Sequence, residues 1–142
     1  MSRENVEAVR RVYEQMAQGN FWAAREIFHP EIAWEWSSSM SGLTGVGTYH
    51  GIEGVEAATR DQFKAWEWFW QEGERFIEAG DDVVVLTRMH GQPKGSEREV
   101  QSKAADVWTF REGSAVRFRS YDSRAEALEA VGLSEQDAHQ TP

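Results

Sequence analysis

The sequence predicts an α+β domain in which helices pack on one face of a curved, mixed or antiparallel sheet. Apolar residues recur at helical spacing through most of the first 66 residues, and from Trp68 onward they alternate with a period of two. A length of 142 residues fits one domain, and no repeat or linker divides the chain. We expect the domain to span residues 1–133 and the last residues, 134–142, to form a disordered tail.

About three helices are expected before the main part of the sheet. The first spans Ser2–Gln18, with Ser2 as its N-cap, and the pair Gly19-Asn20 ends it. A shorter second helix begins near Phe21 and ends at His29-Pro30, and a third runs from about Ile52 to about Trp66. The apolar stripe of the first helix consists of Val6, Val9, Val12, Tyr13 and Met16.

Strands are expected wherever apolar and polar residues alternate. The first is Glu31–Trp36, followed by a loop rich in Ser and Gly from Ser37 to Gly51. The later strands are expected at Trp68–Glu78 (interrupted at Gly73), Val83–His90, Val100–Phe110 and Val116–Tyr121, before a short closing helix at Arg124–Val131.

The composition argues against several classes of partner. Fifteen basic and 24 acidic residues give a net charge of −9, which repels nucleic-acid phosphates and anionic lipid, so we expect neither nucleic-acid nor membrane binding. Cysteine is absent and no histidine pair has metal-ligand spacing, so we expect no metal and no other cofactor. The N-terminus lacks the apolar run of a signal peptide, which favours a cytoplasmic location.

Five segments in order carry a family resemblance: VRRVYEQMAQGNFWAAREIFHPEIAWEW, YHGIEGV, GDDVVVL, VWTFREG and YDSRAEALEAVGL. They resemble the SnoaL-like members of the nuclear transport factor 2 (NTF2-like) superfamily, from Asn5 to Leu133. The resemblance implies a cone-shaped fold of the ketosteroid isomerase and polyketide cyclase type, with a cavity between sheet and helices and often a homodimer formed through the sheet. Because this fold carries isomerases, cyclases, dehydratases, hydrolases and non-catalytic binding proteins, it implies no single activity.

The strand Val100–Phe110 carries the most informative polar residue. Asp106 shares its parity with Trp108 and Phe110, which predicts a carboxylate among inward-facing aromatic side chains. Such a group must be paired, hydrogen-bonded or protonated, and it has either a functional or a purely structural role. If Tyr13 is buried, its hydroxyl needs a partner, and Asp106 is a candidate.

The resemblance assigns Asp106 to the position of the ketosteroid isomerase acid that stays protonated and donates to the substrate oxygen, a case described in general accounts of catalysis. The catalytic base of the isomerase falls at Trp36, which cannot take a proton, and its oxyanion tyrosine falls at Val12, one residue from Tyr13. The Arg-x-Asp pattern of the epoxide hydrolase is also missing, because Ala104 stands where the Arg is expected. These differences argue against steroid isomerisation.

Aromatic residues at inward positions predict a pocket for a small apolar molecule. The expected wall residues are Trp34, Trp36, Trp108, Phe63, Val12 and Met16, and the candidate catalytic residues are Asp106 and Tyr13. Two interpretations follow. The first is a binding protein without chemistry, and the alternative is an enzyme that uses Asp106 as acid or base on an apolar carbonyl or polyketide-like substrate.

On the last strand, Val116, Phe118 and Ser120 are expected to face inward, and the opposite face of the sheet predicts a homodimer contact. It carries Arg117, Arg119 and Tyr121 beside Ala105, Val107 and Thr109, a mixture of apolar and basic residues. The orientation of Arg88 and His90 remains open, although the more apolar parity of their neighbours favours an outward direction. Whether residues 37–51 close the pocket also remains open.

Overall fold

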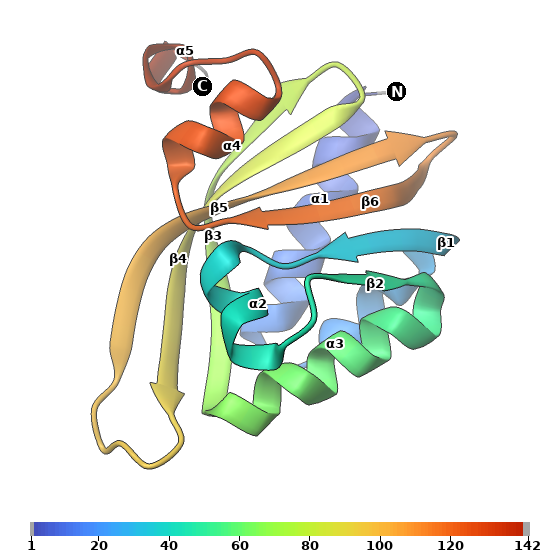
Figure 1. The fold of residues 1–142 in the computed structure, drawn as a ribbon. Coiled ribbons are helices and arrows are strands. Elements are labelled where there is room, and N and C mark those ends of the chain that lie inside the picture. The colour runs from blue at the N-terminus through green and yellow to red at the C-terminus, as the bar shows by residue number, and fades with distance from the viewer. Residues whose placement is uncertain (1, 141–142) are drawn as a thin grey trace.

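Six strands form one curved, unclosed sheet in this computed structural model, which describes residues 2–140 (Figure 1). The strand order is β2-β1-β6-β5-β4-β3, and all neighbours are antiparallel except β1 and β6, which are parallel. The strands are β1 (Phe28–Glu35), β2 (Thr48–His50), β3 (Trp66–Ala79), β4 (Asp82–Pro93), β5 (Val100–Arg111) and β6 (Ser114–Tyr121). The predicted α+β class with a curved mixed sheet is confirmed.

Helices cover both faces of this sheet. The helices α1 (Ser2–Ala17) and α3 (Gly51–Ala65) and the 3-10 helix η1 (Phe21–Ile27) lie on the concave face, where α1 contacts β3 and α3 contacts β1. The short helices α4 (Arg124–Ala130) and α5 (Glu135–Gln140) lie on the convex face near β4 and β5 (Figure 1). No helix among residues 2–140 is long and apolar enough to cross a membrane.

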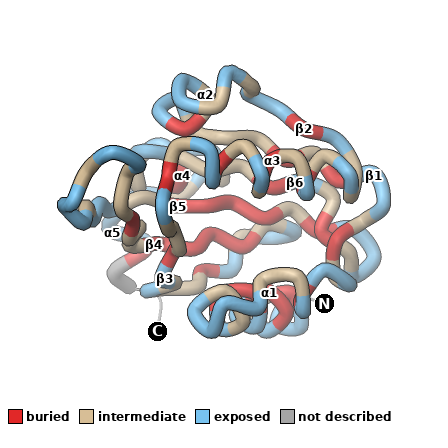
Figure 2. The backbone as a smooth tube through the Cα atoms, turned by 90° about the horizontal axis from the view of Figure 1, so that it is seen from below, coloured by how far each residue is buried: buried red, intermediate tan, exposed pale blue. Residues whose placement is uncertain are grey.

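Two hydrophobic clusters hold these layers together, one on each face. Because side chains alternate along a strand, Val83 and Val85 of β4 join the concave cluster with α1 and α3, whereas Val84 and Leu86 join the convex cluster with α4 and α5. Figure 2 shows the result as buried backbone running along β4 and β5. These central strands are therefore covered from both sides.

The convex cluster changes the prediction for the outer face. Ala105 and Val107 were expected at a homodimer contact, but both are fully buried beneath Ala127 and Leu128 of α4. The short C-terminal helices of the same chain thus cover part of the surface that the sequence assigned to a partner.

The expected disordered tail is also wrong over most of its length. Residues Glu135–Gln140 form α5, and Ala138 is buried in the convex cluster. Ser134 starts this helix, since its hydroxyl accepts from the backbone N–H of Asp137 at 3.2 Å. Residues 141–142 lie outside the described part of the chain.

The segment expected as a loop at 37–51 contains two regular elements. Ser37 caps the short helix α2 (Ser38–Thr44) by accepting from the backbone N–H of Met40, and Gly45 ends it at a positive φ of 78°. The three-residue strand β2 then pairs with β1 and buries Tyr49. The Ser and Gly content that suggested a loop therefore supplies a helix cap and a helix end.

Irregular pairing explains the remaining shifts in element boundaries. The strand β1 begins at Phe28 rather than Glu31, and its register against β6 shifts between Phe28 and Ala33. A second shift after Thr109 turns Ala115 inward in place of the expected Val116. The predicted interruption at Gly73 corresponds to a register shift between β3 and β4.

Candidate functional site

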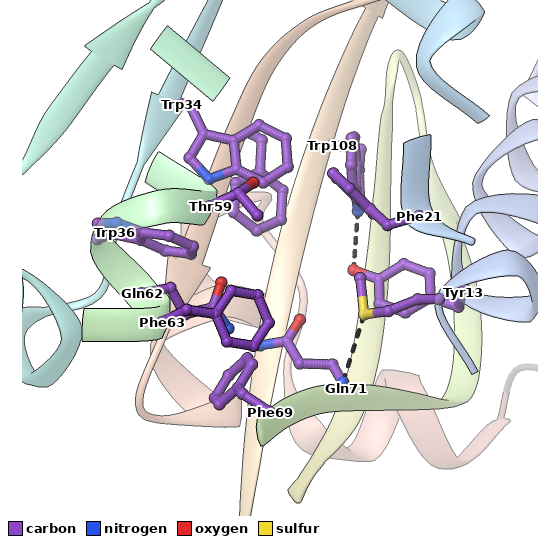
Figure 3. Close-up of a pocket in the computed structure, with 12 residues that line it drawn as sticks. Tyr13, Phe21, Trp34, Trp36, Thr59, Gln62, Phe63, Phe69, Gln71 and Trp108 are labelled. Carbon is purple, nitrogen blue, oxygen red and sulfur yellow. Dashed lines mark hydrogen bonds between the residues drawn. The ribbon is translucent and has the colours of Figure 1, made fainter. Parts of the chain in front are cut away.

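A cavity of about 90 Å³ lies between the concave face of the sheet and the helices α1 and α3 (Figure 3). Its aromatic wall consists of Tyr13, Phe21, Trp34, Trp36, Phe63, Phe69, Trp108 and Phe118, and its other wall residues are Met16, Thr59, Gln62 and Gln71. The fold brings these residues together from both ends of the sequence, because β1 lies next to β6 in the sheet.

The rings of Trp34, Trp108 and Phe118 form the closely packed part of the aromatic wall. Trp34 stacks on Phe118 with ring centroids 4.0 Å apart, and it meets the edge of Trp108 at 5.6 Å. Trp108 in turn packs at 4.8 Å against Phe118. Phe63, by contrast, is 41% exposed and stands at the edge of the space.

Polar groups enter the cavity at a few points only. The amide side chains of Gln62 and Gln71 are buried, and Thr59 donates its hydroxyl to the backbone carbonyl of Val55 at 3.0 Å. Figure 3 shows the Gln71 amide directed into the space between Phe69 and Tyr13. A mainly apolar space with a few placed polar groups is typical of sites for small organic molecules.

Tyr13 connects this cavity to the buried carboxyl group of Asp106. The Tyr13 hydroxyl donates to Asp106 Oδ2 at 2.5 Å and accepts from Trp108 Nε1 at 3.0 Å. Asp106 is fully buried and does not itself line the cavity, so Tyr13 stands between the carboxyl and the space. The hydrogen bond that the sequence suggested between these two residues is present.

Burial dominates the proton affinity of both groups. It raises the pKa of Asp106 to about 7, against a smaller lowering by the Tyr13 hydroxyl and the Gln71 amide. Burial, followed by the nearby Asp106 carboxylate, also raises the pKa of Tyr13 well above its usual value. Tyr13 is therefore neutral near pH 7, where Asp106 exchanges its proton.

Most of the wall residues predicted from the sequence lie around the cavity, but Val12 does not. Trp34, Trp36, Trp108, Phe63 and Met16 line it, whereas Val12 is fully buried in the concave cluster. Consecutive helix residues differ by 100° in direction, and it is Tyr13 that points at the space. The sequence prediction missed six wall residues: Phe21, Thr59, Gln62, Phe69, Gln71 and Phe118. Phe118 had the right parity, whereas Gln62 and Gln71 carry buried amides that no apolar pattern marks.

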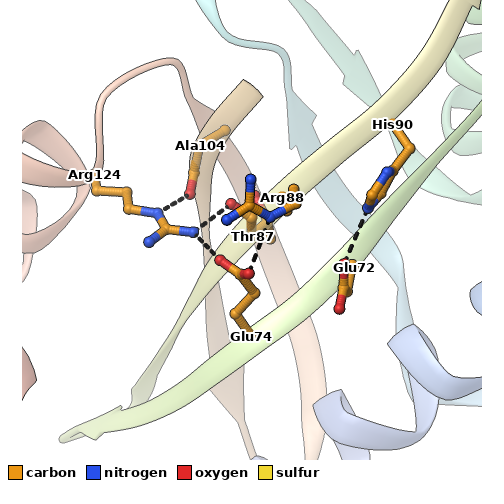
Figure 4. Close-up of polar contacts among 7 residues, drawn as sticks. All are labelled: Glu72, Glu74, Thr87, Arg88, His90, Ala104 and Arg124. Carbon is orange, nitrogen blue, oxygen red and sulfur yellow. Dashed lines mark hydrogen bonds and ion pairs between the residues drawn. The ribbon is translucent and has the colours of Figure 1, made fainter. Parts of the chain in front are cut away.

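Arg88 and His90 share the parity of Val84 and Leu86 in β4, so they lie on the convex face. Figure 4 shows Arg88 directed at Glu74 and His90 directed at Glu72. His90 Nε2 lies 3.0 Å from Glu72 Oε1, and its ring stacks on Trp70 with centroids 4.5 Å apart. Arg88 donates to Glu74 at 3.1 Å. Neither Arg88 nor His90 therefore faces the pair of Asp106 and Tyr13.

Comparison with known families and solved structures gives a family and a fold for this chain. A family model described as a SnoaL-like domain matches residues 9–118. No match was found among curated proteins.

Several solved structures share the fold over almost the whole chain. An NTF2-like protein of unknown function from Burkholderia pseudomallei K96243 is 26% identical, with a TM-score of 0.76 over 92% of this chain and 98% of its own. TerC co-crystallised with polyporic acid is 21% identical, with a TM-score of 0.76 over 90% of this chain and 97% of its own. A putative SnoaL-like polyketide cyclase from Jannaschia sp. CCS1 is 22% identical, with a TM-score of 0.69 over 92% of both chains. The chain belongs to the SnoaL-like domain family and has the NTF2-like fold.

Proposed function

We propose that this protein binds a small, planar and mainly apolar molecule in the aromatic cavity. The observation that carries the proposal is the wall itself, in which stacked rings enclose an apolar space with few polar groups. Removing apolar surface from water contributes about 25 cal/mol per Å², so a ring that fills this space gains affinity without a charged partner. TerC, a protein of the same fold, was co-crystallised with polyporic acid, and this supports the proposal.

The size of the ligand is limited by the volume of the aromatic cavity and by how far its wall side chains can move. A dry cavity of about 150 Å³ binds benzene in another protein, so a ring ligand needs more room than the space of about 90 Å³ here. Phe63 is partly exposed and Met16 is flexible, so both can give way at the edge. We therefore propose a monocyclic or short elongated ligand.

Binding of α-methylstyrene, a planar hydrocarbon, tests the proposal. Titration followed by tryptophan fluorescence is expected to give saturable binding to the wild-type chain. Thr59→Phe places a ring inside the cavity and is expected to abolish binding, whereas Arg60→Phe adds the same ring on the exposed side of α3 and leaves binding unchanged. Equal affinity in both variants and the wild type would reject the cavity as the binding site.

The alternative is catalysis of proton transfer on an apolar carbonyl compound, and the Asp106–Tyr13 pair favours it. A carboxyl with a pKa of about 7 is suited to act as acid or base near neutral pH. Since Asp106 does not border the space, Tyr13 is the group that would touch the substrate, with Asp106 holding or taking the proton behind it. The cyclase, isomerase, dehydratase and hydrolase classes all remain within this alternative.

Exchange of the methyl protons of acetophenone for deuterium in D2O tests this alternative directly. A proton-transfer enzyme is expected to accelerate exchange, and both Asp106→Asn and Tyr13→Phe are expected to remove the acceleration. If the wild-type chain binds acetophenone but leaves its exchange rate unchanged, the protein is a binding protein toward this class of ketone.

We also propose a homodimer formed through the part of the outer face that α4 and α5 leave open. Thr109, Val116 and Arg117 lie there on a partly exposed surface beside His29 and Glu31. Sedimentation velocity is expected to give a dimer for the wild-type chain and a monomer for Val116→Glu. A monomeric wild-type chain at micromolar concentration would reject this proposal.

A further inference from the structure

Two buried tryptophan side chains have indole N–H groups without a hydrogen-bond partner among the residues that the structure describes. Trp34 and Trp66 are each more than nine-tenths buried, and Nε1 of each makes no hydrogen bond. Leaving a buried donor unpaired is unfavourable, and such groups are rare in folded proteins. The tryptophans Trp68 and Trp108 differ, because their N–H groups donate to Gln92 and Tyr13.

Each of the two unpaired donors belongs to the wall of a cavity. Trp34 lines the aromatic cavity, and Figure 3 shows its nitrogen on the ring edge nearest to Thr59. Trp66 lines a second space of about 70 Å³ beneath α2. The benzene edge of Trp66 packs over Gly91, where an added Cβ would lie 2.8 Å from the ring, so the nitrogen edge faces away from that strand.

The two spaces are neighbours that share three wall residues, Trp36, Phe69 and Gln71. A single elongated molecule can therefore occupy both if these side chains yield. Trp36 also lacks a bond of normal geometry, but its N–H lies close enough to the Tyr49 hydroxyl to lower the pKa of that group. Its side chain lines both spaces, and its N–H lies toward the Tyr49 hydroxyl.

Two polar side chains of the second space, Asp122 and Ser120, are already engaged. Asp122 accepts from the backbone N–H and the hydroxyl of Ser39, and Ser120 accepts from the backbone N–H of Ser37. These bonds hold α2 over the space. Among the residues that the structure describes, the Trp66 N–H is a buried donor without a partner in this wall, as the Trp34 N–H is in the first.

We propose that the ligand is an elongated planar aromatic molecule with a hydrogen-bond acceptor, such as a ketone oxygen, toward each end. One acceptor binds the N–H of Trp34 and the other binds the N–H of Trp66. This inference deepens the proposed function and rests on it, because it names the chemical class that the aromatic cavity takes. An acceptor restores a bond to each donor, whereas a hydrocarbon of the same shape leaves both unpaired.

Matched probes of equal shape separate the acceptor from the ring. 1,4-Diacetylbenzene and 1,4-diisopropenylbenzene differ only in oxygen replacing a CH2 group at each end. A neutral hydrogen bond multiplies affinity by roughly 2- to 12-fold, so the diketone is expected to bind about tenfold or more tightly than the diene. Trp34→Phe and Trp66→Phe are each expected to reduce this preference by about 2- to 12-fold and to leave the affinity for the diene nearly unchanged. Trp70→Phe, on the convex face beside His90, is the control and is expected to change neither.

A measurement on the wild-type chain makes the test independent of the variants. With 15N-labelled tryptophan, the indole N–H signals of Trp34 and Trp66 are expected to move downfield with the diketone and not with the diene. Equal affinities for the two probes, with unmoved indole signals, would overturn the acceptor inference and leave the proposed function intact. Absence of binding by either probe and by α-methylstyrene would overturn both.

Discussion

Asp106 shows how strongly a single residue depends on its surroundings. It is fully buried beside Trp108, one of its carboxylate oxygens accepts from Tyr13, and the other has no hydrogen-bond partner among the described residues. Burial disfavours the charged form more than the Tyr13 hydrogen bond favours it, so the net effect is a raised pKa. Between about pH 4 and pH 7, the folded chain therefore keeps a proton on Asp106 that the unfolded chain releases.

The pH dependence of stability follows from this shift. Because the pKa of Asp106 is about 7 in the folded chain against 3.8 for the free side chain, stability falls as pH rises from about 4 to 7 and then levels off. Asp106→Asn removes this loss, so its advantage over the wild type is expected to grow with pH, from roughly 1–2 kcal/mol at pH 5 to roughly 3–4 kcal/mol at pH 8. Urea unfolding of both chains at pH 5, 6, 7 and 8 measures this. Parallel curves for the two chains would contradict the assignment.

Trp36 is a second residue with a measurable role, because it is less buried than Trp108 and borders both internal spaces. Truncating a fully buried aromatic side chain costs about 3–5 kcal/mol, which is expected for Trp108→Ala. Trp36→Ala is expected to cost about 1–3 kcal/mol and to join the two spaces, so that the larger probe naphthalene binds more tightly. Urea unfolding and naphthalene titration check this. A loss as large as that of Trp108→Ala with no gain in binding would place Trp36 in the core.

At the scale of elements, one side chain fastens α4 to the sheet. Arg124 donates to the backbone carbonyls of Ala104 and Thr87 at 3.1 and 2.6 Å, and it pairs with Glu74 at 2.5 Å (Figure 4). A guanidinium can form these bonds together because its donors point in several fixed directions. Arg124 thus joins β3, β4 and β5 to the helix that covers the convex cluster.

Replacing Arg124 is therefore expected to loosen α4. Arg124→Met leaves two backbone carbonyls without this donor and is expected to cost about 1–3 kcal/mol, and Arg124→Lys is expected to recover part of that. The pair of the exposed Lys64 and the partly buried Asp61 supplies a control, since Lys64→Met is expected to change stability by less than about 1 kcal/mol. Thermal unfolding of the three variants compares them. Equal melting temperatures for Arg124→Met and the wild type would show that α4 does not depend on this contact.

The sequence predicted elements best where a local pattern decides them. Helical spacing and alternation located α1, α3 and the four long strands, because each pattern follows from burial of one face. It failed at 37–51, where α2 depends on a Ser37 cap and on contacts with residues distant in the sequence, such as Asp122. It also failed for Val116, since a register shift between strands leaves no trace in the local alternation.

The whole molecule is a sheet with two covered faces, and this arrangement decides both its stability and its site. Strand parity placed Asp106 beside Trp108, and the chain folds so that Tyr13, 93 positions away, reaches it. Gln71 and Thr59 escaped prediction because they are polar residues whose position at the cavity depends on packing between elements. Strand parity therefore predicts some residues of such a site, and packing between elements determines the others.

Hydrogen exchange is expected to follow the same layers. Amides of β4 and β5, covered on both faces, are expected to exchange only through global unfolding, whereas α2 and β2 at the edge of the sheet exchange through local opening. Mass spectrometry of peptides after deuteration measures the difference, and 1,4-diacetylbenzene is expected to slow exchange in α2. Exchange in β4 as fast as in α2 would contradict this order.

The parallel pairing of β1 with β6 has a consequence for folding during synthesis on the ribosome. Trp34 stacks on Phe118, yet at a synthesis rate of about 5–20 residues per second Phe118 follows it by roughly 4–17 seconds. During that interval β1 can pair only with the three-residue strand β2, and the face of Trp34 that packs on Phe118 remains open to solvent or to a chaperone. The aromatic wall is thus among the last parts of the nascent chain to close.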